Sequence, residues 1–171
     1  SHLRSLSFLS RTVGWIYRNI ILEGREREVG RICRSGMWTM GANDYKVGAI
    51  HESPVQEVDY LEACNMALRR DLIEKAGGFD LEFKGTSEWC EVDLAIRVRK
   101  LGYRLVFNPK AIVYHHVSCE GVFGARVNAK VRMENFLRYF AKHGKMNWRF
   151  IACVVFWDGY KTWRGAHEAL Y

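Results

Sequence analysis

The segment from Trp89 to Gly102 restricts the fold more than any other part of the sequence. Its apolar residues recur at spacings of three and four, which is typical of a helix with one buried face. They are Leu94, Ala95, Val98 and Leu101. Gly102 follows the pattern directly, where a left-handed residue commonly ends a helix, and Ser87 is predicted to cap its start. The sequence therefore predicts a helix over 89–101 that packs one face against another layer of the chain.

Two carboxylates occupy the first turn of this predicted helix. At 100° per residue, Glu91 falls on the apolar stripe, so we expect it to point toward the interior or a cleft. Asp93 falls near Arg97 and Lys100 on the polar side, which favours an ordinary salt bridge. A first-turn carboxylate among apolar neighbours can serve as a general base, and the alternative is an acid that only stabilises the helix dipole.

The remaining pattern predicts mixed strands and helices, with the helices gathered at the two ends. Further helices are expected over 3–22, 71–76, 126–143 and 148–170, and strands over 58–67, 103–107 and 111–115. Four glycines over 30–48 indicate irregular strands and turns. We therefore expect a single α/β domain over 1–171, in which a central region, 30–144, lies between helical extensions at 1–29 and 145–171.

Charge and cysteine content limit the environment of the chain. A net charge of +7 favours phosphates, nucleotides or anionic membrane surfaces without choosing among them. The five cysteines are widely spaced and include no Cys-x-x-Cys pair, which predicts reduced thiols and a cytoplasmic location. The longest apolar run, 150–157, is too short to span a bilayer; it suits either core packing or peripheral contact with the inner face of the cell membrane. No nucleic-acid-binding motif is present.

An ordered set of short motifs resembles the C-terminal half of the family 2 glycosyltransferases, over about residues 30–144. The motifs are Gly30-Arg31-Ile32, Val58 to Arg70 with Ala63-Cys64-Asn65-Met66 inside it, Gly77-Gly78-Phe79-Asp80, Glu91-Val92-Asp93-Leu94 with Arg97, Gly102-Tyr103, Pro109 to His115, and Arg132-Met133-Glu134-Asn135. Their order and spacing both match the family. The resemblance implies part of an A-type glycosyltransferase fold, a mixed sheet with flanking helices.

The same resemblance implies an enzyme that transfers a sugar from a nucleotide-sugar donor to a hydroxyl of a glycan or lipid-linked acceptor, with inversion. The family base corresponds to Glu91, while Cys90 replaces the acid that usually precedes it. His115, with His116 as its neighbour, matches the position of a histidine near a divalent metal, Mg²⁺ or Mn²⁺. The residues expected to bind substrate are Asn65, Trp89, Asp93, Arg126 and Arg132.

The nucleotide-binding half of the family, with its Asp-x-Asp metal motif, has no counterpart here. The chain is about a hundred residues shorter than a complete catalytic domain of this kind. We therefore expect a missing N-terminal half or a partner chain that binds the nucleotide. The alternative hypothesis is a non-catalytic module, derived from a glycosyltransferase, that binds an acceptor or docks on a membrane.

Overall fold

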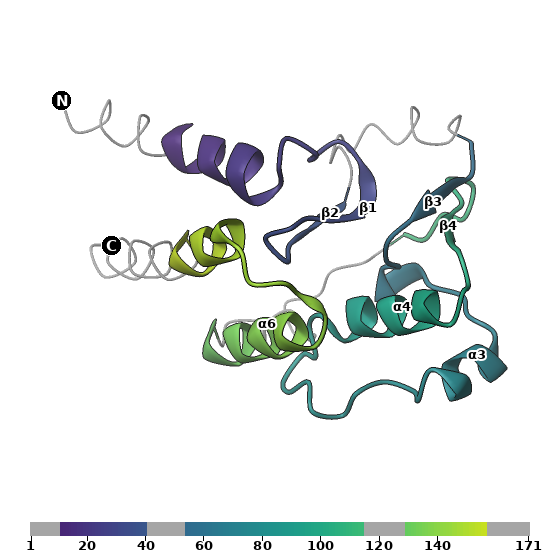
Figure 1. The fold of residues 1–171 in the computed structure, drawn as a ribbon. Coiled ribbons are helices and arrows are strands. Elements are labelled where there is room, and N and C mark those ends of the chain that lie inside the picture. The colour runs from purple at the N-terminus through teal and green to yellow at the C-terminus, as the bar shows by residue number, and fades with distance from the viewer. Residues whose placement is uncertain (1–10, 41–53, 115–128, 157–171) are drawn as a thin grey trace. The chain divides into compact units, whose positions relative to one another are not determined.

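The computed structural model describes residues 11–40, 54–114 and 129–156, which belong to two compact units (Figure 1). One unit holds the described residues up to 40 and from 145 onward. The other holds the described residues between 54 and 144. The hairpin over residues 29–40 thus belongs to the same unit as the two terminal helices. From the sequence, most of this segment was expected in the central region.

The terminal unit consists of two helices and a hairpin. Residues 11–21 are helical and end in a π-helical turn, η1 (Tyr17–Ile21); residues 148–156 form the second helix. Strand β1 (Val29–Ile32) pairs antiparallel with β2 (Trp38–Met40). Apolar side chains from all three parts make the core of this unit. They are Ile21, Leu22, Cys33, Met37, Phe150 and Cys153.

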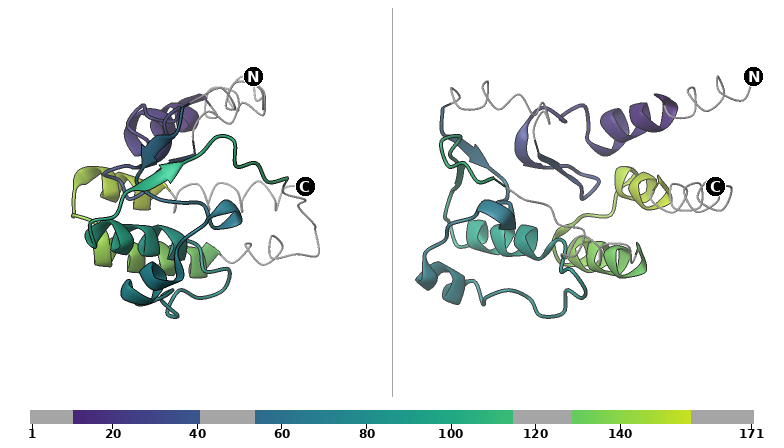
Figure 2. Two further views of the ribbon diagram at one scale, coloured as in Figure 1. Left: turned by 90° about the vertical axis from the view of Figure 1, so that its right-hand side faces the viewer. Right: turned by 180° about the vertical axis from the view of Figure 1, so that it is seen from behind.

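The central unit combines packed helices with a second small sheet. Strand β3 (Gln56–Val58) pairs antiparallel with β4 (Leu105–Phe107), and the 3-10 helix η2 (Ala63–Asn65) follows β3. Helix α3 (Arg70–Lys75) and helix α6 (Ala129–His143) both pack against α4 (Cys90–Lys100) (Figures 1 and 2).

The core of the central unit forms where α4 meets α6 and the sheet. Val58 and Leu105 lie opposite each other in the ladder and are both buried. Helix α4 contributes Val92, Leu94 and Val98, and α6 contributes Phe136, Tyr139 and Phe140. The described residues thus have the expected mixed α/β character, but both sheets have two antiparallel strands.

Three local predictions were wrong. The strand expected over 58–67 ends at Val58, because β4 begins at Leu105, opposite Val58, and offers no further partner. No strand forms over 111–114; the Ala111 N–H instead donates to the carbonyl of Asn108 in a turn. Ser87 does not cap α4: the N-cap position belongs to Trp89, and the Ser87 hydroxyl donates to the Phe83 carbonyl at 3.2 Å.

Candidate functional site

The first turn of α4 carries the predicted base. Trp89 precedes the helix with a left-handed backbone (φ 73°), and Cys90 and Glu91 are its first two residues. This turn leaves backbone N–H groups at the positive end of the helix dipole. The Glu91 side chain is half-buried, so this position combines a favourable electrostatic field with partial access to solvent.

Cys90 is a hydrogen-bond donor to Glu91. Its thiol lies 3.6 Å from Glu91 Oε2. Burial, followed by the charge of Glu91, raises the pKa of the Cys90 thiol to about 12. The thiol is therefore protonated at neutral pH, and it can orient the carboxylate but cannot act as a nucleophile.

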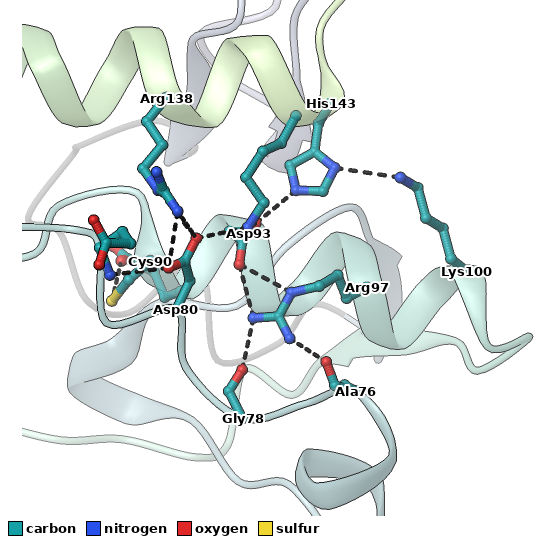
Figure 3. Close-up of polar contacts among 12 residues, drawn as sticks. Ala76, Gly78, Asp80, Cys90, Asp93, Arg97, Lys100, Arg138 and His143 are labelled. Carbon is teal, nitrogen blue, oxygen red and sulfur yellow. Dashed lines mark hydrogen bonds and ion pairs between the residues drawn. The ribbon is translucent and has the colours of Figure 1, made fainter.

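Asp93 lies at the centre of a buried ion cluster (Figure 3). Its Oδ2 accepts hydrogen bonds from Arg97 Nε at 2.9 Å and Nη2 at 2.7 Å. Its Oδ1 accepts from His143 Nε2 at 2.7 Å and is ion-paired with Lys142. Burial alone would raise the pKa of Asp93, but these hydrogen bonds outweigh it and hold the pKa well below the usual range. Asp93 is therefore ionised throughout the neutral range and is a weak base.

The hydrogen bonds of His143 assign its tautomer. Lys100 Nζ lies 3.3 Å from His143 Nδ1, and an ammonium group can only donate. Nδ1 therefore accepts from Lys100, and the ring proton lies on Nε2, where it is donated to Asp93. His143, the last residue of α6, thus contacts both the first turn and the last residue of α4.

Arg97 connects α4 to the end of α3. Besides its two bonds to Asp93, its guanidinium donates to the carbonyl of Ala76 and, at 2.7 Å, to that of Gly78. Gly77 and Gly78 both have positive φ values, 84° and 71°, which glycine adopts without strain. This turn therefore points the carbonyls of Ala76 and Gly78 toward the Arg97 guanidinium.

Asp80 forms a second acidic centre beside the first. It accepts from Arg138 Nη2 and from Lys142 Nζ, each at 2.9 Å, and from the backbone N–H of Glu82. Burial opposes ionisation, but the bonds from Lys142, Glu82 and Arg138 lower the pKa of Asp80 to about 2. Lys142 contacts both Asp80 and Asp93, so one side chain of α6 joins the two centres (Figure 3).

Asn135 fixes the loop before α4. This buried amide accepts from the Lys84 N–H at 3.0 Å and donates to the Lys84 carbonyl at 2.9 Å. The paired bonds imitate one rung of a β-ladder. Helix α6 therefore fixes the backbone of the loop that precedes Glu91.

Two further contacts join the same loop to α6. Arg132 lies 3.3 Å from Glu88 in an ion pair, and the buried ring of Trp89 packs 5.5 Å from the ring of Phe136. Trp89 and Arg132, two of the residues predicted to bind substrate, therefore help to fix the start of α4.

The other predicted site residues have separate locations. Asn65 ends η2, and its side-chain amide donates to the carbonyl of Ala111 at 2.7 Å, four residues before His115. His115 and Arg126 lie outside the described residues. The structure therefore brings together Trp89, Glu91, Asp93 and Arg132, and their contacts with substrate stay predictions.

The predicted position of Asp93 needs correction. Asp93 does lie beside Arg97, as expected, but its predicted position on the solvent side is wrong, because it is fully buried. The reason is that α6 packs on the polar side of α4 and brings Lys142 and His143 onto Asp93. Glu91, expected to point toward the interior or a cleft, is half-buried.

Sequence reasoning missed Asp80, Asn135, Lys142 and His143. Asn135 and His143 share a helical face with the buried aromatic residues of α6, and two polar residues on an apolar stripe are a signal for buried polar partners. Lys142 and Asp80 carried no such signal, since both belong to charged or turn segments of ordinary composition.

The described residues do not supply a metal-binding group. Within residues 11–40, 54–114 and 129–156, no three His, Cys, Asp or Glu side chains are placed to hold an ion. The buried acids of the central unit are instead satisfied by arginine, lysine and histidine.

Comparison with known proteins gave no relatives. No protein-family model matches the sequence, and neither the curated proteins nor the solved structures yield a significant match.

Proposed function

We propose that the chain is the acceptor-side part of an inverting glycosyltransferase with an A-type fold, with Glu91 as its general base. The donor would be a nucleotide sugar, and the acceptor a hydroxyl of a glycan or a lipid-linked sugar. The proposal extends the motif resemblance, and the arrangement of α4 supports it.

The main support for the proposal is that the two carboxylates in the first turn of α4 differ in their exposure to solvent. Asp93 is fully buried among Arg97, Lys142 and His143, so neither a substrate nor its proton can reach it without opening the cluster. Glu91 is half-buried on the same turn. A hydroxyl can approach Glu91, and the neutral Cys90 thiol orients its carboxylate.

The proposed step needs one proton transfer and one substitution. Glu91 accepts the proton of the acceptor hydroxyl while the hydroxyl oxygen bonds to the anomeric carbon, on the face opposite the diphosphate. The bond from that carbon to the diphosphate oxygen breaks, and its electron pair leaves with the nucleoside diphosphate. One displacement of this kind inverts the configuration.

The buried residues of the cluster act as positioning residues in this proposal. Asp93 and Arg97 fix the first turn of α4 against the glycine turn, and Asn135 fixes the loop before it. The rigid support keeps Glu91 in one place, which general base catalysis requires. Trp89 contributes packing to the same support.

Donor binding belongs mainly to groups outside the described residues. The resemblance assigns the nucleotide and the Mg²⁺ or Mn²⁺ ion to a preceding half and to His115. We propose Arg126 and Arg132 as cations that face the diphosphate.

The test is release of nucleoside diphosphate from a panel of nucleotide sugars by the protein encoded by the complete reading frame. Assays with Mg²⁺ or Mn²⁺ and with EDTA should show metal-dependent turnover that Glu91→Gln abolishes. Glu74→Gln, an exposed change on α3, is the matched control and should retain the wild-type rate. Absence of turnover with every common nucleotide sugar would contradict the proposal.

A further inference from the structure

Nearly all the excess positive charge of the chain belongs to the terminal unit. Residues 1–42 and 145–171 hold 11 Lys and Arg against five Asp and Glu, a net charge of +6. Residues 43–144 hold 15 against 14, a net charge of +1. The two units therefore differ in the surfaces that they attract, and the terminal unit favours polyanions.

The helix over 148–156 is apolar on two opposite sides. Phe150 and Cys153 are buried in the core of the terminal unit. Trp148, Ile151 and Val155, at spacings of three and four, form the opposite stripe and are 60%, 54% and 65% exposed. We call these three side chains the exposed stripe. A helix that is apolar all round normally lies in a protein core or against lipid.

One member of the exposed stripe, Trp148, is packed against an anchored cation. The Arg149 guanidinium lies 4.5 Å from the centre of the Trp148 ring. The same guanidinium donates to the carbonyl of Ile20 at 2.6 Å and pairs with Glu23 at 3.2 Å. The tryptophan is thus oriented by a cation that is itself anchored on the neighbouring helix.

The two helices of the terminal unit carry basic side chains and no acidic ones among their described residues, 11–21 and 148–156. Lys145 is exposed just before the second helix, and Arg11 and Arg18 are exposed on the first. Exposed tryptophan next to cations is typical of surfaces that lie at the headgroup level of a membrane.

We propose that the exposed stripe docks the terminal unit onto the surface of an anionic lipid bilayer. Apolar side chains would enter the headgroup boundary while the cations meet lipid phosphates. The contact lies along the surface, since no helix among the described residues is long and apolar enough to cross a membrane. The excess charge favours lipid over a second copy of this chain, whose terminal unit would carry the same +6. The inference does not depend on the proposed glycosyltransferase activity.

The test measures co-flotation of the purified 171-residue chain with vesicles. One set contains phosphatidylcholine alone, and the other contains phosphatidylcholine with about a third phosphatidylglycerol, at low and at near-physiological salt. We expect binding to the anionic vesicles that weakens as salt rises, because the attraction of basic residues is screened. Equal binding to both sets, or no binding, would overturn the proposal.

A pair of double variants separates the exposed stripe from general surface hydrophobicity. Ile151→Ser with Val155→Ser should weaken partitioning by about tenfold or more, because each buried aliphatic side chain contributes to insertion. The matched control is Val106→Ser with Ile112→Ser in the central unit, where the two residues are 53% and 49% exposed. The control should bind as the wild type does. Equal loss in both variants would contradict a specific stripe.

A second pair of double variants tests how much the basic residues contribute to vesicle binding. Arg11→Gln with Arg18→Gln should lower binding to anionic vesicles by about tenfold and flatten its salt dependence. Arg104→Gln with Lys110→Gln removes two exposed charges from the central unit and should change binding little. Circular dichroism of every variant confirms folding. If the stripe variant instead dissociates a dimer in light scattering while vesicle binding persists, the stripe is a contact between copies and the proposal is wrong.

Discussion

His143 Nε2 donates to Oδ1 of Asp93 at 2.7 Å, which ties the last residue of α6 to the first turn of α4. Asp93 is fully buried, so each cation or donor around it compensates for lost hydration. The proposed base, Glu91, lies two residues away on the same turn. The geometry of the candidate site therefore depends on a cluster that a substrate does not need to touch.

Replacing His143 should destabilise the chain. His143→Ala removes a hydrogen bond to a buried carboxylate, and we expect a loss of about 1.5 to 3 kcal/mol in the free energy of unfolding. His143→Gln places an amide donor near the position of Nε2 and should restore part of the loss. Urea unfolding followed by circular dichroism measures both. Lys130→Ala, on an exposed position of α6, is the control and should stay within about 0.5 kcal/mol of the wild type.

Asp93→Asn should alter the dependence of stability on pH. The pKa values of Asp93 and Asp80 are lowered on folding, that of Asp80 from 3.8 to about 2, so between these values the unfolded chain binds more protons. Their contribution is complete above about pH 5 and falls as the medium becomes more acidic. Asp93→Asn should cost about 3 to 5 kcal/mol at pH 7, because it breaks ion pairs made by a fully buried carboxylate and leaves Arg97 without its counterion.

The same variant should have a shallower decline of stability below pH 4, so its difference from the wild type shrinks with acidification. Urea midpoints from pH 7 to pH 3 give the comparison. Glu82→Gln removes an exposed acid outside the Asp93 cluster and serves as the control. Parallel curves for Asp93→Asn and the wild type would show that Asp93 is not the titrating group.

Local patterns were sufficient for the helices. The predicted helix over 89–101 is α4 (Cys90–Lys100), and the helix expected from Asp71 to a glycine stop is α3. Periodicity and glycine positions are local properties, so a single sequence contains them. Strand length was less predictable, since β3 ends at Val58, opposite the first residue of its partner β4.

The burial of Asp93 could not be predicted, because it depends on how two distant segments pack. An aspartate followed by an arginine four residues later also occurs on exposed helices. What distinguishes this pair is α6, whose Lys142 and His143 come from about fifty residues further along the chain. The tertiary contact thus determines which face of α4 is covered.

Asn135 should control the mobility of the loop before α4. Asn135→Leu keeps a buried side chain of similar size but removes both bonds to the Lys84 backbone. Amide hydrogen exchange over residues 83–89 should accelerate at least about tenfold, since the Lys84 N–H loses its acceptor. Leu137→Asn, an exposed change on α6, is the control. Unchanged exchange at Lys84 in Asn135→Leu would show that other contacts hold the loop.

The proposed base is tested by comparing the two acids of the first turn in an active enzyme that contains this chain. Glu91→Gln retains shape but cannot accept a proton, so kcat should fall by about 10² to 10⁴, while donor affinity is retained. Asp93→Asn should act mainly through stability, and its kcat, measured under conditions where the variant is folded, should fall much less. The separation follows from burial, because Asp93 is fully buried and Glu91 is only half-buried. A Glu91→Gln enzyme near the wild-type rate, beside an inactive but folded Asp93→Asn enzyme, would assign the base to Asp93 and require the buried cluster to open during turnover.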